Sequence, residues 1–212
     1  MSFTAGQSFS FGEQPSTTKW NYLWGNDYAL QDWSAFTNDT FPVALMDSDM
    51  SDFGFMELDR TTLGSGGDTI TVSSFAAKAM LKIVVKALDT GGTLTGQMTF
   101  NSDSGSNYSG RRSIDGAADS SSTSQAYIQL AGATVASPFL AEAMIYNVAA
   151  DEKCVLSRTV HANTAGAGTA PTKVEAAWKW VNTSNQITTV SVVNAGSGDF
   201  ATGSEVIVYG KD

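Results

Sequence analysis

The sequence has very few of the side chains that most catalytic and metal sites need. Its 212 residues include one cysteine, Cys154, and one histidine, His161. A single cysteine forms no intrachain disulfide, and we interpret Cys154 as a small buried side chain rather than a nucleophile. Two such residues cannot supply the four ligands of a zinc site. A Ser-His-Asp triad would have to use His161, which we interpret as a polar loop residue.

Charge is also scarce, and positive charge most of all. Charged residues make up 16% of the chain, with 12 Lys and Arg against 21 Asp and Glu, so the net charge is −9. A nucleic-acid-binding protein needs a basic patch that displaces counterions from phosphates. The pair Arg111-Arg112 is the one local candidate, and it is flanked by Asp103, Asp115 and Asp119. We therefore expect no nucleic-acid partner.

Long apolar runs are missing as well. Each apolar run is too short to cross a bilayer, so we expect no membrane insertion. The first residues, Met-Ser-Phe-Thr-Ala-Gly-Gln, lack the basic and apolar regions of a signal peptide. We expect the chain to be made in a cytoplasm and to reach its destination by assembly.

Motifs for the common reaction classes are absent from the sequence too. The glycine-rich segments lack the Lys-Ser/Thr of a phosphate-binding loop, and no Gly-x-Ser-x-Gly nucleophile turn occurs. The sequence therefore predicts a protein that is not an enzyme and has no cofactor. Two carboxylate-containing loops leave calcium binding open beside ordinary solvated turns, namely Asp47-Ser-Asp49 with Asp52, and residues 103–107.

Short alternating segments fill the chain from residue 53 onward and predict an all-β domain, an antiparallel β-sandwich over 53–212. Strands 80–88 and 93–100, joined by Asp89-Thr-Gly-Gly92, are expected to form a hairpin. Residues 101–124 and 162–171 are rich in turn-forming residues and are expected to be long loops. The other predicted strands are 55–60, 69–72, 126–130, 139–146, 153–158, 173–180, 186–193 and 205–209.

Residues 1–52 have a different composition, because they hold three of the five tryptophans and show little strand alternation. Ser16 follows Pro15 and precedes apolar residues at helical spacing, which predicts a short helix near 17–24. Such a helix is marginal by itself in water, so its aromatic side chains need a surface that buries them. We interpret residues 1–52 as an aromatic-rich arm for anchoring and assembly.

Trp178 and Trp180 are two residues apart on a predicted strand, so their side chains point to the same face. Two interpretations remain open. The pair either fills the sandwich core or a contact between subunits, or forms an aromatic platform on which sugars stack.

Three stretches of the sequence resemble a family of tailed-phage virion structural proteins, and they occur in the order that the family uses. The first is 15–32, the second is 99–108, and the third is 180–188 continued at 198–210. The first contains Lys19-Trp20-Asn21 and Gly25-Asn26-Asp27. It departs from the family pattern at Trp24 and Trp33. Each stretch also has a purely structural interpretation as a turn or a terminal strand.

The resemblance implies a jelly-roll-like domain and a structural role at the outer surface of a virion, as a fibre, tail or capsid decoration protein. It implies other virion proteins as partners and a homo-oligomer, with a trimer as the first expectation. The alternative is a carbohydrate-binding module that recognises a host surface glycan. The expected anchoring residues are Trp20, Asn21, Leu23, Trp24, Asn26, Asp27, Tyr28 and Trp33. The candidate ligand or interface residues are Asp103, Asn107, Tyr108, Trp178 and Trp180.

Overall fold

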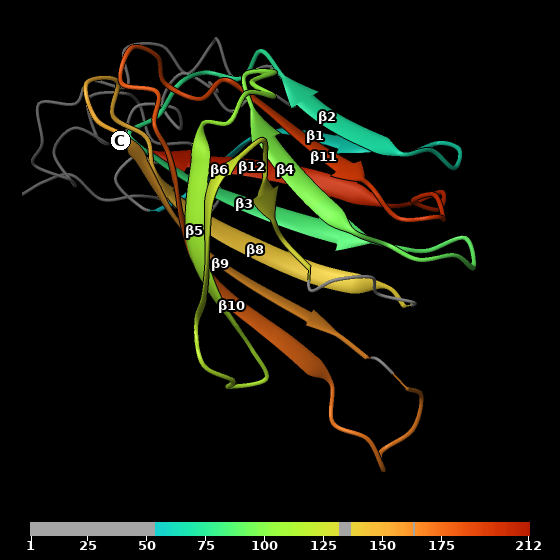
Figure 1. The fold of residues 1–212 in the computed structure, drawn as a ribbon. Helices are drawn as coiled ribbons and strands as arrows, with labels where there is room; N and C mark the ends of the chain where they lie inside the picture. The colour runs from blue at the N-terminus through green and yellow to red at the C-terminus, as the bar shows by residue number, and fades with distance from the viewer. Residues whose placement is uncertain (1–53, 132–136, 163) are drawn as a thin grey trace, which may run out of the picture. The chain divides into compact units, whose positions relative to one another are not determined.

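The structure is a computed structural model that describes residues 54–131, 137–162 and 164–212. Within these ranges the chain is all-β, its strands pair antiparallel, and there is no helix, as Figure 1 shows. The all-β prediction is therefore confirmed. The predicted helix at 17–24, and the arm that contains it, lie outside the described residues.

Twelve strands form two sheets. The eight-stranded sheet has the order β1 (Met56–Thr62), β12 (Glu205–Lys211), β3 (Met80–Ala87), β8 (Phe139–Tyr146), β9 (Lys153–His161), β10 (Thr172–Trp180), β5 (Tyr108–Ile114) and β6 (Ser120–Gln125). The four-stranded sheet has the order β2 (Thr69–Ser73), β11 (Thr189–Asn194), β4 (Gly96–Phe100) and β7 (Ile128–Gln129).

The pairing of the strands is nested along the chain. Strand β1 pairs with β12, β2 with β11, β3 with β8, and β4 with β7. Two hairpins interrupt this series: β5–β6 comes between β4 and β7, and β9–β10 comes between β8 and β11. Both hairpins join the same sheet beyond β8, and this addition makes that sheet eight strands wide.

The buried faces of both sheets contribute to one hydrophobic cluster. Side chains alternate between the two faces of a strand, and β8 follows this rule along its whole length, with every second residue buried. Burying one large aliphatic or aromatic side chain stabilises the fold by about 1.5–3 kcal/mol. The largest fully buried apolar side chains are Trp180, Tyr108, Phe100, Phe200, Ile70, Leu81, Ile83, Leu94, Met98, Ile128 and Leu130.

The predicted hairpin between 80–88 and 93–100 is wrong, because β3 and β4 lie in different sheets. The segment between them crosses from one sheet to the other. Asp89 in this crossing makes an isolated β-bridge with Phe200, which also bridges Gly67. Both strands alternate and both face the shared core, so their patterns do not distinguish a hairpin from a crossing.

The predicted loop at 101–124 is also wrong, because it contains β5 and most of β6. These strands have few apolar residues, so their sequence has the composition of a loop. Strand β5 pairs with β10 without interruption from Tyr108↔Trp180 to Ile114↔Val174. The second predicted loop, at 162–171, does connect β9 to β10.

Strand β11 begins at Thr189, three residues later than predicted, because asparagine side chains bind the preceding backbone. Asn101 Oδ1 accepts hydrogen bonds from the N–H groups of Thr188 (2.9 Å) and Thr189 (3.0 Å). Asn147 Oδ1 accepts one from Ile187 N–H at 2.7 Å. Side-chain amides thus replace the strand pairing that this short segment lacks.

The inner face of β5 makes room for Trp178. A Cβ atom at Gly110 would overlap the Trp178 indole ring, whereas Gly64 has nothing within 4 Å of such an atom. The ring therefore packs flat against the β5 backbone, a contact that requires glycine.

We expect Gly110→Ala to lower the free energy of unfolding by about 1–3 kcal/mol, because the core side chains must shift to admit a methyl group. Gly64→Ala is the matched control and should leave stability almost unchanged. Urea unfolding followed by tryptophan fluorescence measures both variants. Equal stability of the Gly110→Ala variant and the wild-type chain would show that Trp178 does not pack on β5 as described.

Candidate functional site: the outer face of the eight-stranded sheet

Four of the five candidate ligand or interface residues come together, but they bind one another. Asp103 Oδ2 accepts a hydrogen bond from Trp180 Nε1 at 2.7 Å. Asn107 Nδ2 donates to both oxygens of the same carboxylate, at 3.0 and 2.9 Å, and the N–H of Gly105 donates to Oδ1 at 2.9 Å. The carboxylate is therefore saturated by donors from within the chain.

The Tyr108 hydroxyl extends this cluster into the core. It donates to the Asp103 carbonyl at 3.0 Å and accepts from the N–H of Phe100 at 3.0 Å. The Tyr108 ring stacks on Trp180 with centroids 6.3 Å apart, and Phe100 meets Trp180 edge-on at 5.7 Å. Burial raises the pKa of Tyr108 above its usual value. We call Asp103, Asn107, Tyr108 and Trp180 the loop brace, because they fix the 101–107 turn to the sheet.

Lys153 completes the packing beside the loop brace, and sequence reasoning did not single it out. Its side chain is fully buried, and Nζ donates to the carbonyls of Asp151 and Asn182, both at 2.7 Å. Nζ also lies 6.0 Å from the centre of a Trp180 ring. Burial lowers the pKa of Lys153, and the charge of Asp151 opposes that change. This lysine joins two turns through their carbonyl groups.

The position of Lys153 corrects the interpretation of its neighbour. Cys154 was expected to be buried, but it is exposed. Strand β9 presents Lys153, Val155 and Ser157 to the interior, so Cys154 points outward. Both faces of β9 carry apolar residues, and the sequence pattern therefore does not determine which of them faces the core.

His161 is not a loop residue, since it is the last residue of β9 and is 9% exposed. Burial lowers its pKa, and the charge of Asp115 opposes that change. Trp178 and Trp180 point to the same face as predicted, and both are buried, at 5% and 1% exposed. The core interpretation of this pair is therefore confirmed, and neither ring is available as an exposed platform for sugars.

The other candidate residues either lie outside the described residues or are hydrogen-bonded within the domain. The expected anchoring residues Trp20, Asn21, Leu23, Trp24, Asn26, Asp27, Tyr28 and Trp33 lie outside the described residues, as do Asp47, Asp49 and Asp52. Within the described ranges, no three His, Cys, Asp or Glu residues gather in a way that suits a metal ion. These ranges also contain no apolar helix of membrane-spanning length. The 103–107 turn uses its carboxylate for the loop brace.

The outer face of the eight-stranded sheet is a different kind of surface. Of the six exposed large hydrophobic residues in the described ranges, five project from this face: Met80, Leu140, Tyr146, Leu156 and Val160. Leu156, in the middle of β9, is 66% exposed. Exposed apolar side chains gathered on one face are typical of a surface that a partner covers.

Two hollows on this face, of about 570 and 470 Å³, lie over β8, β9 and β10. They share Glu142, Arg158 and Glu175, which stand in one row across these three strands. Arg111 and Asp119 line the first hollow, and Lys82 and Lys173 line the second. The hollows therefore combine an aliphatic floor with charged side chains of both signs.

Ion pairs connect the strands on this face. Lys82 lies 3.5 Å from Glu142, and Glu175 lies 3.0 Å from Lys173 and 4.0 Å from Arg158. The paired side chains are between about a third and three quarters exposed, so each pair stabilises the fold by at most about 1 kcal/mol. Their charges therefore remain accessible to a partner.

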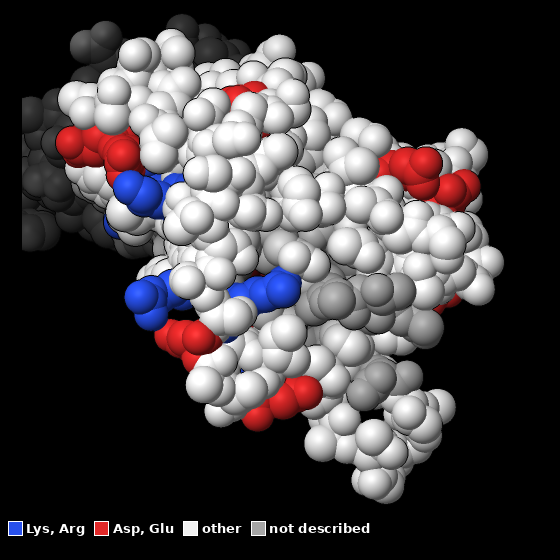
Figure 2. All heavy atoms as spheres, viewed as in Figure 1, with Lys and Arg blue, Asp and Glu red and all other residues white. Residues whose placement is uncertain are grey.

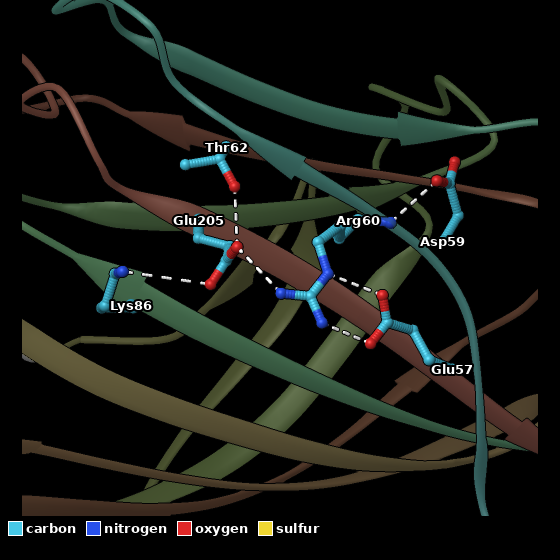
Figure 3. A network of polar contacts seen from close by, with 6 residues as sticks. All are labelled: Glu57, Asp59, Arg60, Thr62, Lys86 and Glu205. Carbon is cyan, nitrogen blue, oxygen red and sulfur yellow. Dashed lines mark hydrogen bonds and ion pairs between the residues drawn. The ribbon is translucent and has the colours of Figure 1, made fainter.

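A second group of ion pairs lies where β1, β12 and β3 meet (Figure 3). Glu205 accepts a hydrogen bond from Thr62 at 2.7 Å and lies 3.3 Å from Arg60 and 3.9 Å from Lys86. The hydrogen bond from Thr62, together with Lys86 and Arg60, lowers the pKa of Glu205, although burial opposes the change. Arg60 also binds both oxygens of Glu57. Charged side chains of both signs thus continue along the outer face to this edge.

The geometry of the outer face suits binding better than catalysis. A glycosidase needs one carboxylic acid held protonated near a second carboxylate. Glu142 and Glu175 flank Arg158, are 46% and 48% exposed, and are each ion-paired. Both carboxylates are therefore solvent-accessible partners in ion pairs and do not form a desolvated pair of acids. This face was not identified from the sequence. The almost continuous apolar run at 139–146 is a signal for it, because such a run places apolar side chains on both faces of β8.

We expect Asp103→Ala to lower the free energy of unfolding by about 2 kcal/mol at pH 7, because it removes a charged acceptor that three groups share. Burial tends to raise the pKa of Asp103, but the donors Trp180, Gly105 and Asn107 outweigh it, so the pKa is lowered. The stability that this carboxylate contributes is therefore present above its unfolded pKa, near 4, and is lost as the pH falls through its folded pKa.

The difference in stability between the Asp103→Ala variant and the wild-type chain should accordingly shrink on acidification below about pH 4. Asp119→Ala, at an exposed position just before β6, is the control and should change stability little at any pH. Urea unfolding at several pH values measures this. A difference that does not depend on pH would contradict the role given to the Asp103 carboxylate.

Comparison with known proteins adds no assignment to this geometry. No family model matches the chain, and neither a curated protein nor a solved structure matches it.

Proposed function

We propose that the chain is a non-enzymatic structural component of the outer surface of a tailed-phage virion, as a fibre, tail or capsid decoration protein. The observation that carries the proposal is the nested pairing of β1 with β12, β2 with β11, β3 with β8 and β4 with β7. We infer that the two sheets face each other as a jelly-roll sandwich with two inserted hairpins. Viral capsid proteins are among the proteins built on this architecture.

The loop brace supports the same proposal. The second stretch that resembles virion proteins, 99–108, meets the first part of the third, 180–188, in this brace, because Asp103 and Tyr108 contact Trp180. The other part of the third stretch, 198–210, contains most of β12, which pairs with β1. The resemblance after residue 98 therefore involves residues that this fold needs for its own closure, which favours a shared fold.

In this proposal the domain faces outward, and residues 1–52 attach it to other virion proteins or to neighbouring subunits. The chain would act as a homo-oligomer. The resemblance makes a trimer the first expectation, whereas symmetry alone allows other closed rings. It would need no cofactor, nucleic acid or membrane.

A carbohydrate-binding module for host recognition is the second candidate. The charged side chains that line the hollows of about 570 and 470 Å³ favour it, because they match sugar hydroxyls in hydrogen bonding. The burial of Trp178 and Trp180 counts against it, since the pair no longer offers a stacking surface.

A glycan array with the purified chain separates the two candidates. The structural role predicts no glycan signal. A signal that Arg158→Ala abolishes, and that Lys78→Ala outside the hollows leaves unchanged, would instead establish the second candidate.

Deletion of residues 1–40 tests the structural role. The truncated chain should keep the far-ultraviolet circular dichroism of a folded β-domain, because residues 51–212 form a compact unit. It should no longer be incorporated when phage lacking the full-length protein are complemented with it. Incorporation at the wild-type level would contradict attachment through the N-terminal segment.

A further inference from the structure

The hydrogen-bonding groups that the fold leaves unused are concentrated toward one edge of the eight-stranded sheet. Five buried side-chain atoms of the described residues have no hydrogen-bond partner: Arg112 Nε and Nη1, Trp178 Nε1, His161 Nδ1 and Ser137 Oγ. Arg112 is on β5, Trp178 on β10 and His161 on β9, which are neighbouring strands. Buried polar groups in folded proteins are nearly always hydrogen-bonded, so each orphaned group needs an explanation.

Arg112 points to the inner side of the sheet. The inner side of β5 begins with the buried Tyr108, continues with Gly110, whose backbone touches the Trp178 ring, and reaches Arg112 next. The pairing of β5 with β10 is uninterrupted over these residues, so the alternation of faces holds. Arg111 lies on the opposite face, where it lines the first hollow. The two adjacent arginines therefore lie on opposite sides of one strand.

The Trp178 ring and the Arg112 side chain are neighbours. Trp178 pairs with Gly110 across the strands, and its ring lies over that glycine. Arg112 is diagonal to Trp178 on the same face, at a separation that long and aromatic side chains bridge. The indole N–H and the guanidinium N–H groups are donors only, so the two side chains cannot satisfy each other. The group that both of them lack is an acceptor.

The chain itself provides no charged acceptor at this position. Within the described ranges Arg112 takes part in no ion pair. The carboxylates nearest in sequence are engaged elsewhere, because Asp115 accepts a hydrogen bond from the N–H of Lys173 and Asp119 lines the first hollow. On the face drawn in Figure 2, charged side chains form small separate groups among uncharged atoms. A buried charge that lacks a partner is strongly destabilising, so Arg112 needs an anion from outside the chain.

We propose that Arg112 and Trp178 form a binding site for an oxyanion, a carboxylate or phosphate group, near the edge of the eight-stranded sheet. The guanidinium supplies the charge and several donors, and the indole N–H adds one more. Arg112 is partly exposed and the neighbouring β6 is the edge strand, so a ligand has a path to the guanidinium from solvent. The site goes beyond the proposed function and does not rest on it.

Thermal unfolding in different anions tests the site. The full chain is compared in sodium chloride, sodium acetate and sodium phosphate at pH 7 and equal ionic strength. Acetate or phosphate should raise the unfolding midpoint by a few degrees relative to chloride, because a ligand that binds only the folded chain stabilises it. The separate acetate and phosphate measurements show which of the two groups the site binds.

Arg112→Met and Arg111→Met are the matched variants, since each removes one arginine from β5. In chloride, Arg112→Met should unfold at the wild-type midpoint or above it, because it removes a buried charge without a partner. It should also lose the added stabilisation by acetate or phosphate, whereas Arg111→Met should respond as the wild-type chain does. Phosphate also stabilises proteins by exclusion from their surfaces, and this general effect is common to all three chains.

The indole N–H resonances of the ¹⁵N-labelled wild-type chain give a second measurement that depends on no variant's stability. Titration with the anion should shift the Nε1–H resonance of Trp178, which is identified by its absence from the spectrum of Trp178→Phe. The Nε1–H resonance of Trp180 is the internal control, because this group already donates to Asp103 and should not move.

Three results would each overturn the site. They are a Trp178 resonance that neither anion shifts, an Arg112→Met chain that responds to the anions as the wild-type chain does, and an Arg112→Met chain that is less stable than wild type in chloride. The last result would show that the guanidinium is used within the chain.

Discussion

The pleat of the eight-stranded sheet is the constraint on which the rest of the structure depends. On β8, β9 and β10 successive side chains alternate between the shared core and the outer face. The buried side chains of the four-stranded sheet belong to the same core. The inner positions hold apolar side chains such as Phe139, Ile145 and Trp178, together with the buried polar residues Lys153 and His161. Both hollows described lie on the outer face of this sheet.

Two inserted hairpins make this face wide, and buried polar groups make the insertion stable. The β5–β6 hairpin has little apolar surface of its own, so the loop brace and the Trp178 ring hold it against β10. Lys153 and Asn147 act in the same way. Their side chains satisfy backbone groups in the turn before β9, in the segment after β10 and just before β3. A buried polar group without such partners would cost several kcal/mol, so these residues are structural requirements.

Alternation in the sequence located β3, β8 and β10 closely, because their apolar residues recur with period two and turn residues bound them. The same rule failed on β5 and β6, since serine and glycine strands are held by neighbours and not by their own composition. It also failed for Cys154, because β9 has apolar residues on both faces and only the complete sheet determines which one is inside. The nested pairing joins residues up to about 150 positions apart in sequence, as in Thr62↔Glu205, and local patterns contain no record of it.

The candidate site residues were also predicted only in part. Turn chemistry drew attention to Asp103 and Asn107, and aromatic spacing drew attention to Trp180, and these residues do meet, but as an internal support. The outer face was not anticipated, because its charged residues are scattered along the sequence on several strands and become one surface after folding. Surface charge of this kind can be recognised once the strand order is known.

An electron-microscopy map of the intact particle tests the central claim, that the chain is a structural subunit of a virion, most directly. The account predicts density for the domain in symmetric rings on the outside of the particle. Particles that lack this density would contradict it.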